Sequence, residues 1–172
     1  LPKRGYNTDI VIEAKWTDVI GIENSTIADI SILAYDLECT SGDGSFPQAN
    51  RDTDKIIQIG STISYNGKEN CHFKHIITLG SCAPIDGAIV ESYDTEKEVI
   101  LAWQKLVVKM DPDIITGWNT YGFDNKYIHD RAVHLKIEDK FGKFSRLRQK
   151  CEYIDTQLSS SALGDNKIRY YN

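Results

Sequence analysis

The chain has 172 residues, of which 41% are hydrophobic and 26% are charged, and its formal net charge is −5 at pH 7. This length suits one domain with a modest core, and these proportions are those of an ordinary globular chain, not of a disordered or fibrous one. The four cysteines form no CxxC pair and have no regular spacing, so neither a disulfide framework nor a zinc site is predicted. Since the sequence contains no signal peptide or long apolar segment, we expect an intracellular protein without a membrane partner.

The N-terminal part is predicted to be β-structure and loop. Apolar residues alternate over Tyr6–Trp16, which predicts a strand within a first region, residues 1–29, that lies outside the main domain. The main domain, residues 30–172, is predicted to begin with a strand over Ile30–Glu38. Residues 39–54, rich in Gly, Ser and Asp, then predict a loop.

A hairpin and a helix are predicted next. The predicted strands Lys55–Tyr65 and Cys71–Leu79 flank an Asn-Gly dipeptide, which is typical of a hairpin turn. Thr95 and Glu98 form a capping box, which predicts the start of a helix. Apolar residues then recur at helical spacing: Val99, Ile100, Trp103, Leu106, Val107 and Met110.

A short strand and a second helix follow. Pro112 ends the first helix, and Ile114 and Ile115 predict a short buried strand. Gly117 is predicted to turn the chain. The next helical pattern spans Asn125–Leu135.

The C-terminal part has a weaker pattern. Ser159–Ser161 with Gly164 indicates a flexible connection. The final run, NKIRYYN, is strand-like and stops without a turn or cap, and the chain begins without Met. We therefore expect the sequence to be a piece of a longer protein.

Three carboxylates form a candidate metal site. Asp36 and Glu38 end an apolar strand and are two residues apart, so both side chains should leave the same face of that strand. Asp124 stands at the start of the second predicted helix. Hard divalent cations prefer oxygen ligands, and a third carboxylate beside such a pair would complete much of a two-metal site.

Each carboxylate also has a simpler interpretation. The acidic-x-acidic spacing recurs in four other pairs, so the spacing alone carries little weight. Asp36 and Glu38 could mark a strand end that runs into solvent, and pattern alone favours a helix-capping role for Asp124. The apolar run before Asp36 favours a functional role for the first pair, because acidic groups at the end of a hydrophobic strand are costly to desolvate.

Two longer stretches carry a resemblance to a known family. The runs at 34–61, which begins AYDLECTSGDG, and 82–132, which contains DPDIITGWNTYGFD, resemble the 3′→5′ proofreading exonuclease domain of family B DNA polymerases, in particular of the delta type and of large DNA viruses. The resemblance is good over residues 30–135. The family's first motif, Asp-x-Glu, and its second, Asn-x-x-x-Phe-Asp, match five residues: Asp36, Glu38, Asn119, Phe123 and Asp124.

The resemblance implies a role for each matched residue. Asp36 would bridge two ions of Mg²⁺ or Mn²⁺, Glu38 would bind the ion that activates the attacking water, and Asp124 would hold the ion near the leaving 3′ oxygen. Asn119 would contact the terminal nucleotide, and Phe123 would pack against unpaired bases. From pattern alone, Asn119 could instead be a turn residue and Phe123 a core aromatic.

The resemblance also implies the fold and a missing part. It implies an α/β fold with a ribonuclease-H-like mixed sheet and flanking helices (DEDD exonuclease type), incomplete at the C-terminus, with residues 1–29 as a strand and linker from the polymerase N-terminal region. The family's third motif, Tyr-x-x-x-Asp, supplies a fourth carboxylate and a water-positioning tyrosine, and none of the nine tyrosines is followed by Asp at that spacing. We therefore expect weak metal binding and little exonuclease activity from the isolated chain.

The acidic net charge does not oppose this resemblance. A metal-dependent nuclease site is locally acidic, and bound cations reverse that sign. The implied partners are the single-stranded 3′ end of primer DNA, the rest of the polymerase chain and, as a further candidate, a processivity factor, in the nucleus or at a viral replication site.

Six basic residues within fifteen positions could line a single-strand path or lie on a solvated loop, and the pattern favours the loop. They are Lys136, Lys140, Lys143, Arg146, Arg148 and Lys150.

Three functions remain as hypotheses. The first is the proofreading exonuclease portion of a replicative DNA-directed DNA polymerase, with two-metal hydrolysis of the 3′-terminal phosphodiester. The second is a free-standing DEDD exonuclease, which the delta-like runs and the upstream strand disfavour. The third is a non-catalytic, exonuclease-like scaffold, which the intact carboxylates disfavour.

Overall fold

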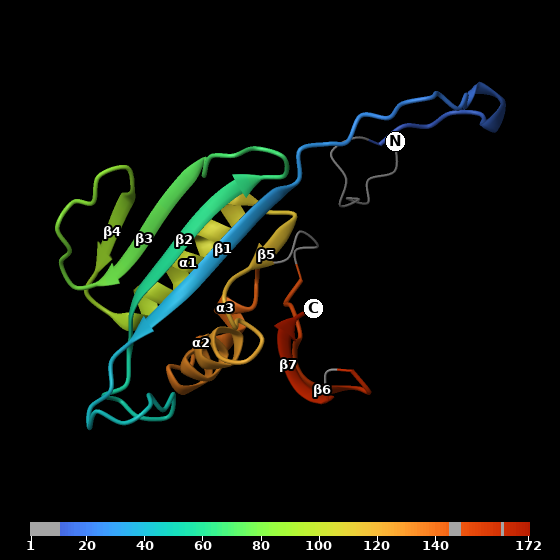
Figure 1. The fold of residues 1–172 in the computed structure, drawn as a ribbon. Helices are drawn as coiled ribbons and strands as arrows, with labels where there is room; N and C mark the ends of the chain where they lie inside the picture. Colours follow the sequence, from blue (N-terminus) through green and yellow to red (C-terminus); the bar gives the residue numbers. More distant parts are fainter. Residues whose placement is uncertain (1–10, 145–148, 163) are drawn as a thin grey trace.

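The computed structural model describes residues 11–144, 149–162 and 164–172. Its main body is a five-stranded mixed sheet with strand order β4-β3-β2-β1-β5, and α1 lies across one face of it (Figure 1). The elements are η1 (Trp16–Asp18), β1 (Ser31–Cys39), β2 (Ile56–Tyr65), β3 (Phe73–Leu79), β4 (Ile89–Tyr93), α1 (Glu96–Met110), β5 (Ile114–Thr116), α2 (Asp124–His134), α3 (Glu138–Phe141), β6 (Tyr153–Ser160) and β7 (Gly164–Tyr171). This arrangement confirms the predicted α/β architecture.

The two faces of β1 have different environments. Leu33, Tyr35 and Leu37 are buried in the core that the sheet forms with α1, whereas Asp36 and Glu38 are exposed on the opposite face. This alternation is the period-2 pattern of a strand with one covered face. It confirms that the two carboxylates leave the same side of the sheet.

Helix α1 begins and ends where the sequence predicts. Thr95 Oγ1 accepts a hydrogen bond from the Glu98 N–H at 3.3 Å, and Glu98 Oε2 accepts one from the Thr95 N–H at 3.0 Å, which completes the capping box. In the core, the ring centres of Trp103 and Tyr35 are 4.6 Å apart. The indole N–H of Trp103 donates a hydrogen bond to Ser61 Oγ. The helix therefore packs its predicted apolar face on the sheet.

Three details of the sheet differ from the prediction. The short strand β5 is present, but Ile114 and Ile115 are 46% and 40% exposed, so the prediction that it is buried was wrong. In the described part of the chain, it is an edge strand whose one partner is β1. The hairpin between β2 and β3 is confirmed, although β3 begins at Phe73 instead of Cys71. Strand β4, which pairs in parallel with β3, was not predicted.

The C-terminal prediction of a flexible connection was also wrong. Strands β6 and β7 form an antiparallel hairpin in which Ser160 pairs with Gly164 and Tyr153 pairs with Tyr171. Most of β6 is exposed, so the hairpin depends on its hydrogen-bonded ladder and on contacts at one end. There the ring of His129 from α2 stacks on Tyr153 with ring centres 3.7 Å apart, and its Nδ1 lies 2.7 Å from the Tyr171 hydroxyl.

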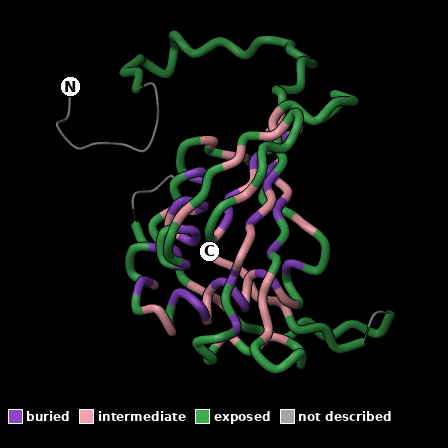
Figure 2. Tube along the Cα trace, turned by 90° about the vertical axis from the view of Figure 1, so that its left-hand side faces the viewer, coloured by how far each residue is buried: buried purple, intermediate pink, exposed green. Residues whose placement is uncertain are grey.

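The segment before β1 runs away from the sheet, and residues 11–29 are all exposed (Figures 1 and 2). Of the strand predicted over Tyr6–Trp16, residues up to Ile10 lie outside the described part, and Val11–Lys15 form no strand. In the described ranges, we find no helix with the length and apolar character needed to cross a membrane.

Candidate active site

The site is built where β5 stops short along the edge of β1. Strand β5 pairs with Ile32–Ala34, and among the residues that the structure describes no strand pairs with β1 on that side beyond Ala34. The first residue of α2 provides the hydrogen-bond acceptor that a neighbouring strand would otherwise supply. Asp124 Oδ1 accepts a hydrogen bond from the Leu37 N–H at 3.2 Å. The backbone of Leu37 lies between Asp36 and Glu38, and the contact therefore brings the third predicted carboxylate to the end of β1 that carries the first two.

Asp124 does not cap its own helix. Phe123 holds the N-cap position and makes no capping bond through its side chain, so the capping interpretation of Asp124 is not supported. The Asp124 side chain is 2% exposed. Burial raises its pKa to about 6, with a further upward contribution from the charge of Asp36, while the Leu37 N–H acts in the opposite direction. A buried carboxylate held beside a second one is a costly arrangement that a bound cation would relieve.

We expect Asp124→Asn to stabilise the chain by about 1–3 kcal/mol at pH 7 in the presence of EDTA. The amide oxygen can still accept from the Leu37 N–H, while the cost of the buried charge disappears. The folded chain binds the Asp124 proton more tightly than the unfolded chain does, so the ionised group lowers stability above pH 6, and this penalty fades as the pH falls towards 4. Urea unfolding at pH 7 and pH 5 measures the difference. A variant that is less stable at pH 7, or equally favoured at both pH values, would contradict the origin we assign to this shift.

The loop between β5 and α2 depends on a close approach to β1. A Cβ atom at Gly117 would lie 2.3 Å from the Tyr35 carbonyl oxygen, so only glycine lets the loop pass at this distance. Asn119 then adopts a left-handed conformation (φ 55°), and its carbonyl accepts the N–H groups of Gly122 and Phe123, both at 2.9 Å. Asn119 therefore has a structural role as a turn residue, and its contact with a terminal nucleotide stays a prediction.

Phe123 lies in a row of aromatic rings next to Asp124. Its ring is half-buried, with ring centres 5.1 Å from Tyr127 and 5.3 Å from Phe46, the latter in an edge-to-face arrangement. Phe46 comes from the loop between β1 and β2 and is 68% exposed. Phe46 was not predicted as a candidate residue, although an aromatic side chain in the polar loop that follows the acidic pair was an available signal.

The donor set suits a hard cation by its chemistry. Asp36, Glu38 and Asp124 offer carboxylate oxygens, the ligands that Mg²⁺ and Mn²⁺ take in proteins. Within the ranges that the structure describes, no three His, Cys, Asp or Glu side chains gather closely enough to hold an ion. The three carboxylates thus form no closed cage, and their sharing of two ions stays a prediction.

The basic cluster is only partly described. Arg146 and Arg148 lie outside the described residues. Lys150 forms an ion pair with Asp139 of α3 at 2.6 Å, and this contact raises the pKa of the lysine. At least one member of the cluster is therefore engaged on the protein surface. The choice between a single-strand path and a solvated loop stays open.

A family model described as "DNA polymerase family B, exonuclease domain" matches residues 1–170. The chain is 44% identical over 138 residues to a DNA polymerase of Acanthamoeba polyphaga mimivirus, which covers 80% of this chain and 8% of that protein. It is 38% identical over 148 residues to the DNA polymerase delta catalytic subunit of Glycine max (86% and 13%) and 34% identical over 175 residues to that of Mesocricetus auratus (96% and 15%).

The chain spans 8–15% of the length of these three curated relatives. The family match extends through the first region as well as the sheet, so residues 1–29 fall within it. The mixed sheet with flanking helices is the ribonuclease-H-like architecture that the resemblance implies. The chain therefore belongs to the exonuclease-domain family of the family B DNA polymerases.

Proposed function

We propose that this chain is the proofreading 3′→5′ exonuclease part of a replicative DNA-directed DNA polymerase and hydrolyses the 3′-terminal phosphodiester. The observation that carries the proposal is the bond from the Leu37 N–H to Asp124, which joins the end of β1 to the start of α2. It supports a site in which carboxylates from two segments far apart in the sequence act together.

We assign the three carboxylates to metal binding. Two divalent ions, Mg²⁺ or Mn²⁺, would supply an activated water and stabilise the leaving 3′ oxygen. Asp36 would contact both, Glu38 the one near the water, and Asp124 the one near the leaving group. Exposure of Asp36 and Glu38 leaves room for substrate phosphate oxygens, which Mg²⁺ commonly takes to complete its shell.

The aromatic rings support selection of an unpaired end. Phe46 and Phe123 offer ring surface that an unpaired base can contact, whereas a base inside a duplex is already stacked on its neighbours. Asn119 would contact the same terminal nucleotide. In this proposal the rest of the polymerase supplies the third motif, the reaction takes place in the nucleus or at a viral replication site, and a processivity factor is a further candidate partner.

The proposal predicts that the parent polymerase shortens a 5′-labelled oligonucleotide stepwise from its 3′ end and that EDTA stops the reaction. Phe46→Ala should raise KM for an unpaired 3′ end about tenfold, the effect of losing about 1.4 kcal/mol of base stacking. Phe46 is suited to this test because it is 68% exposed, so the loss of its ring should disturb the fold little. Tyr65→Ala, at the far end of β2, is the control. Metal-independent shortening would contradict the proposed chemistry, and an unchanged KM in the Phe46 variant would contradict the base contact.

A further inference from the structure

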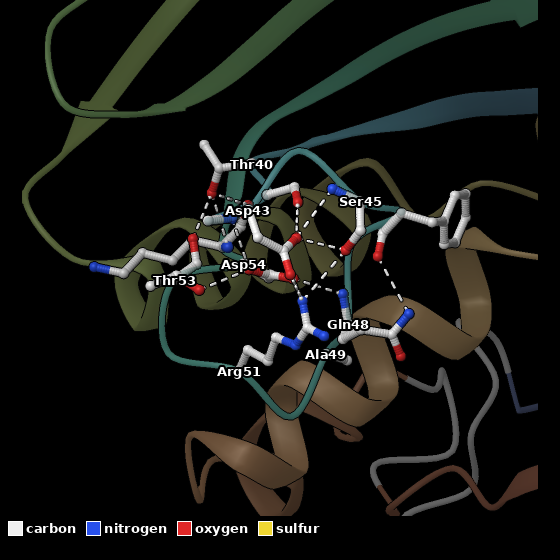
Figure 3. A network of polar contacts seen from close by, with 12 residues as sticks. Thr40, Asp43, Ser45, Gln48, Ala49, Arg51, Thr53 and Asp54 are labelled. Carbon is white, nitrogen blue, oxygen red and sulfur yellow. Dashed lines mark hydrogen bonds and ion pairs between the residues drawn. The ribbon is translucent and has the colours of Figure 1, made fainter.

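The loop that carries Phe46 has no regular secondary structure, yet it is tied by a dense polar network. Asp54, at the end of this loop, has a fully buried side chain. Its carboxylate accepts hydrogen bonds from the Gly42 N–H at 3.0 Å, the Gln48 N–H at 2.9 Å and the Thr53 hydroxyl at 2.7 Å (Figure 3). The bond from Gly42 and then that from Gln48 lower the pKa of Asp54. One buried carboxylate therefore fixes both arms of the loop.

A second carboxylate fixes the backbone next to Phe46. Asp43 accepts from the Ser45 N–H at 3.0 Å and from the Ser45 hydroxyl, and it pairs with Arg51 Nη1 at 2.8 Å (Figure 3). Ser45 immediately precedes Phe46. These contacts limit the conformations open to the residue that presents the exposed ring.

The guanidinium group of a residue in α2 also binds the backbone of this loop. Arg131 of α2 is 1% exposed, and its Nη1 donates to the carbonyl oxygens of Ala49 at 2.8 Å and Arg51 at 2.7 Å. Helix α2 begins at Asp124, directly after Phe123. The helix that supplies the third carboxylate therefore also sets the position of the loop, and the two parts meet where Phe46 touches Phe123.

We propose that Asp54 and Arg131 are positioning residues for the exonuclease reaction and act through Phe46, whose ring they hold against Phe123. This inference rests on the proposed function. A loop of this length would otherwise lose conformational freedom when the DNA end binds, and an arm that is already ordered avoids that cost.

The test compares Asp54→Asn with Asp52→Asn in the parent polymerase. The Asp54 variant keeps one acceptor oxygen but places an NH₂ group against the Gln48 N–H, whereas Asp52 lies in the same loop with a 94% exposed side chain. Asp54→Asn should raise KM for an unpaired 3′ end about five- to tenfold with little change in kcat, and Asp52→Asn should not. Asp43→Ala, at an exposed position, should act in the same direction and serves if the first variant fails to fold.

The decisive comparison repeats these changes in a Phe46→Ala background. If Asp54 acts through Phe46, its substitution should have almost no further effect there, because the ring that it positions is gone. An equal fold-change in both backgrounds would overturn the inference and leave a merely structural role. Loss of the metal-dependent reaction on substitution of Asp36 and Glu38 is the separate readout for the proposed function, so a failure of the inference can be told apart from a failure of the proposed function.

Discussion

Arg131→Ala should lower the free energy of unfolding by about 3–5 kcal/mol, the usual effect of removing one partner of a buried ion pair. Arg131 and Glu96 are 1% and 5% exposed, and their carboxylate–guanidinium contact includes the Arg131 Nε–H donating to Glu96 Oε1 at 2.7 Å. Glu96 Oε1 also accepts from the Ile56 N–H at 2.9 Å. Without the guanidinium, a buried carboxylate loses its counter-charge, and the carbonyl groups of Ala49 and Arg51 lose a donor.

Urea unfolding of the chain measures this effect. Lys126→Met is the matched control, since Lys126 pairs with Asp130 on the same helix, and their side chains are 43% and 36% exposed. An exposed pair contributes at most about 1 kcal/mol, so this control should change stability little. Arg131→Met combined with Glu96→Leu should recover part of the loss, because it removes both charges together. If the Arg131 and Lys126 variants lowered the free energy of unfolding equally, the buried pair would contribute no more to stability than the exposed pair.

The elements with local signals were predictable from sequence. Helix α1 has a capping box and a regular apolar face, and β1 combines an apolar run with the period-2 placement of Asp36 and Glu38. Strand β4 lacks such a signal. It pairs in parallel with β3 across the connection at 80–88, so no tight hairpin turn marks the pair in the sequence. Strand β6 also escaped prediction, since its exposed residues show no apolar alternation and its ladder with β7 is a backbone property, whereas the strand-like run NKIRYYN did indicate β7.

The site was predictable in its residue types and less so in its connections. The acidic pair and Asp124 could be chosen from motifs, but the bond to the Leu37 N–H depends on where β5 ends along β1. The pairing of Glu96 with Arg131 joins residues 35 positions apart and leaves no trace in spacing. The contact between Phe46 and Phe123 depends on the conformation of the loop, which the polar network around Asp43 and Asp54 determines. Such a contact between distant residues leaves no local pattern in the sequence.

The second large effect concerns the acidic pair itself. In the polymerase that the proposed function implies, replacing Asp36 and Glu38 together by Ala should reduce 3′→5′ removal of nucleotides by a factor on the order of 10²–10⁴ or more, since each substitution removes a positioned charged group. Nucleotide addition should be largely unaffected, because chemistry at one metal site does not require the other. Asp86→Ala with Asp94→Ala is the matched control, as it removes two exposed carboxylates elsewhere in the chain.

The most direct measurement is therefore the rate at which these polymerases excise a mispaired 3′ nucleotide, read beside their rate of synthesis on a matched primer. We predict that the Asp36/Glu38 variant loses excision and keeps synthesis, while the Asp86/Asp94 variant keeps both. Excision at the wild-type rate by the Asp36/Glu38 variant would contradict the account, because it would mean that these two carboxylates at the end of β1 are structural.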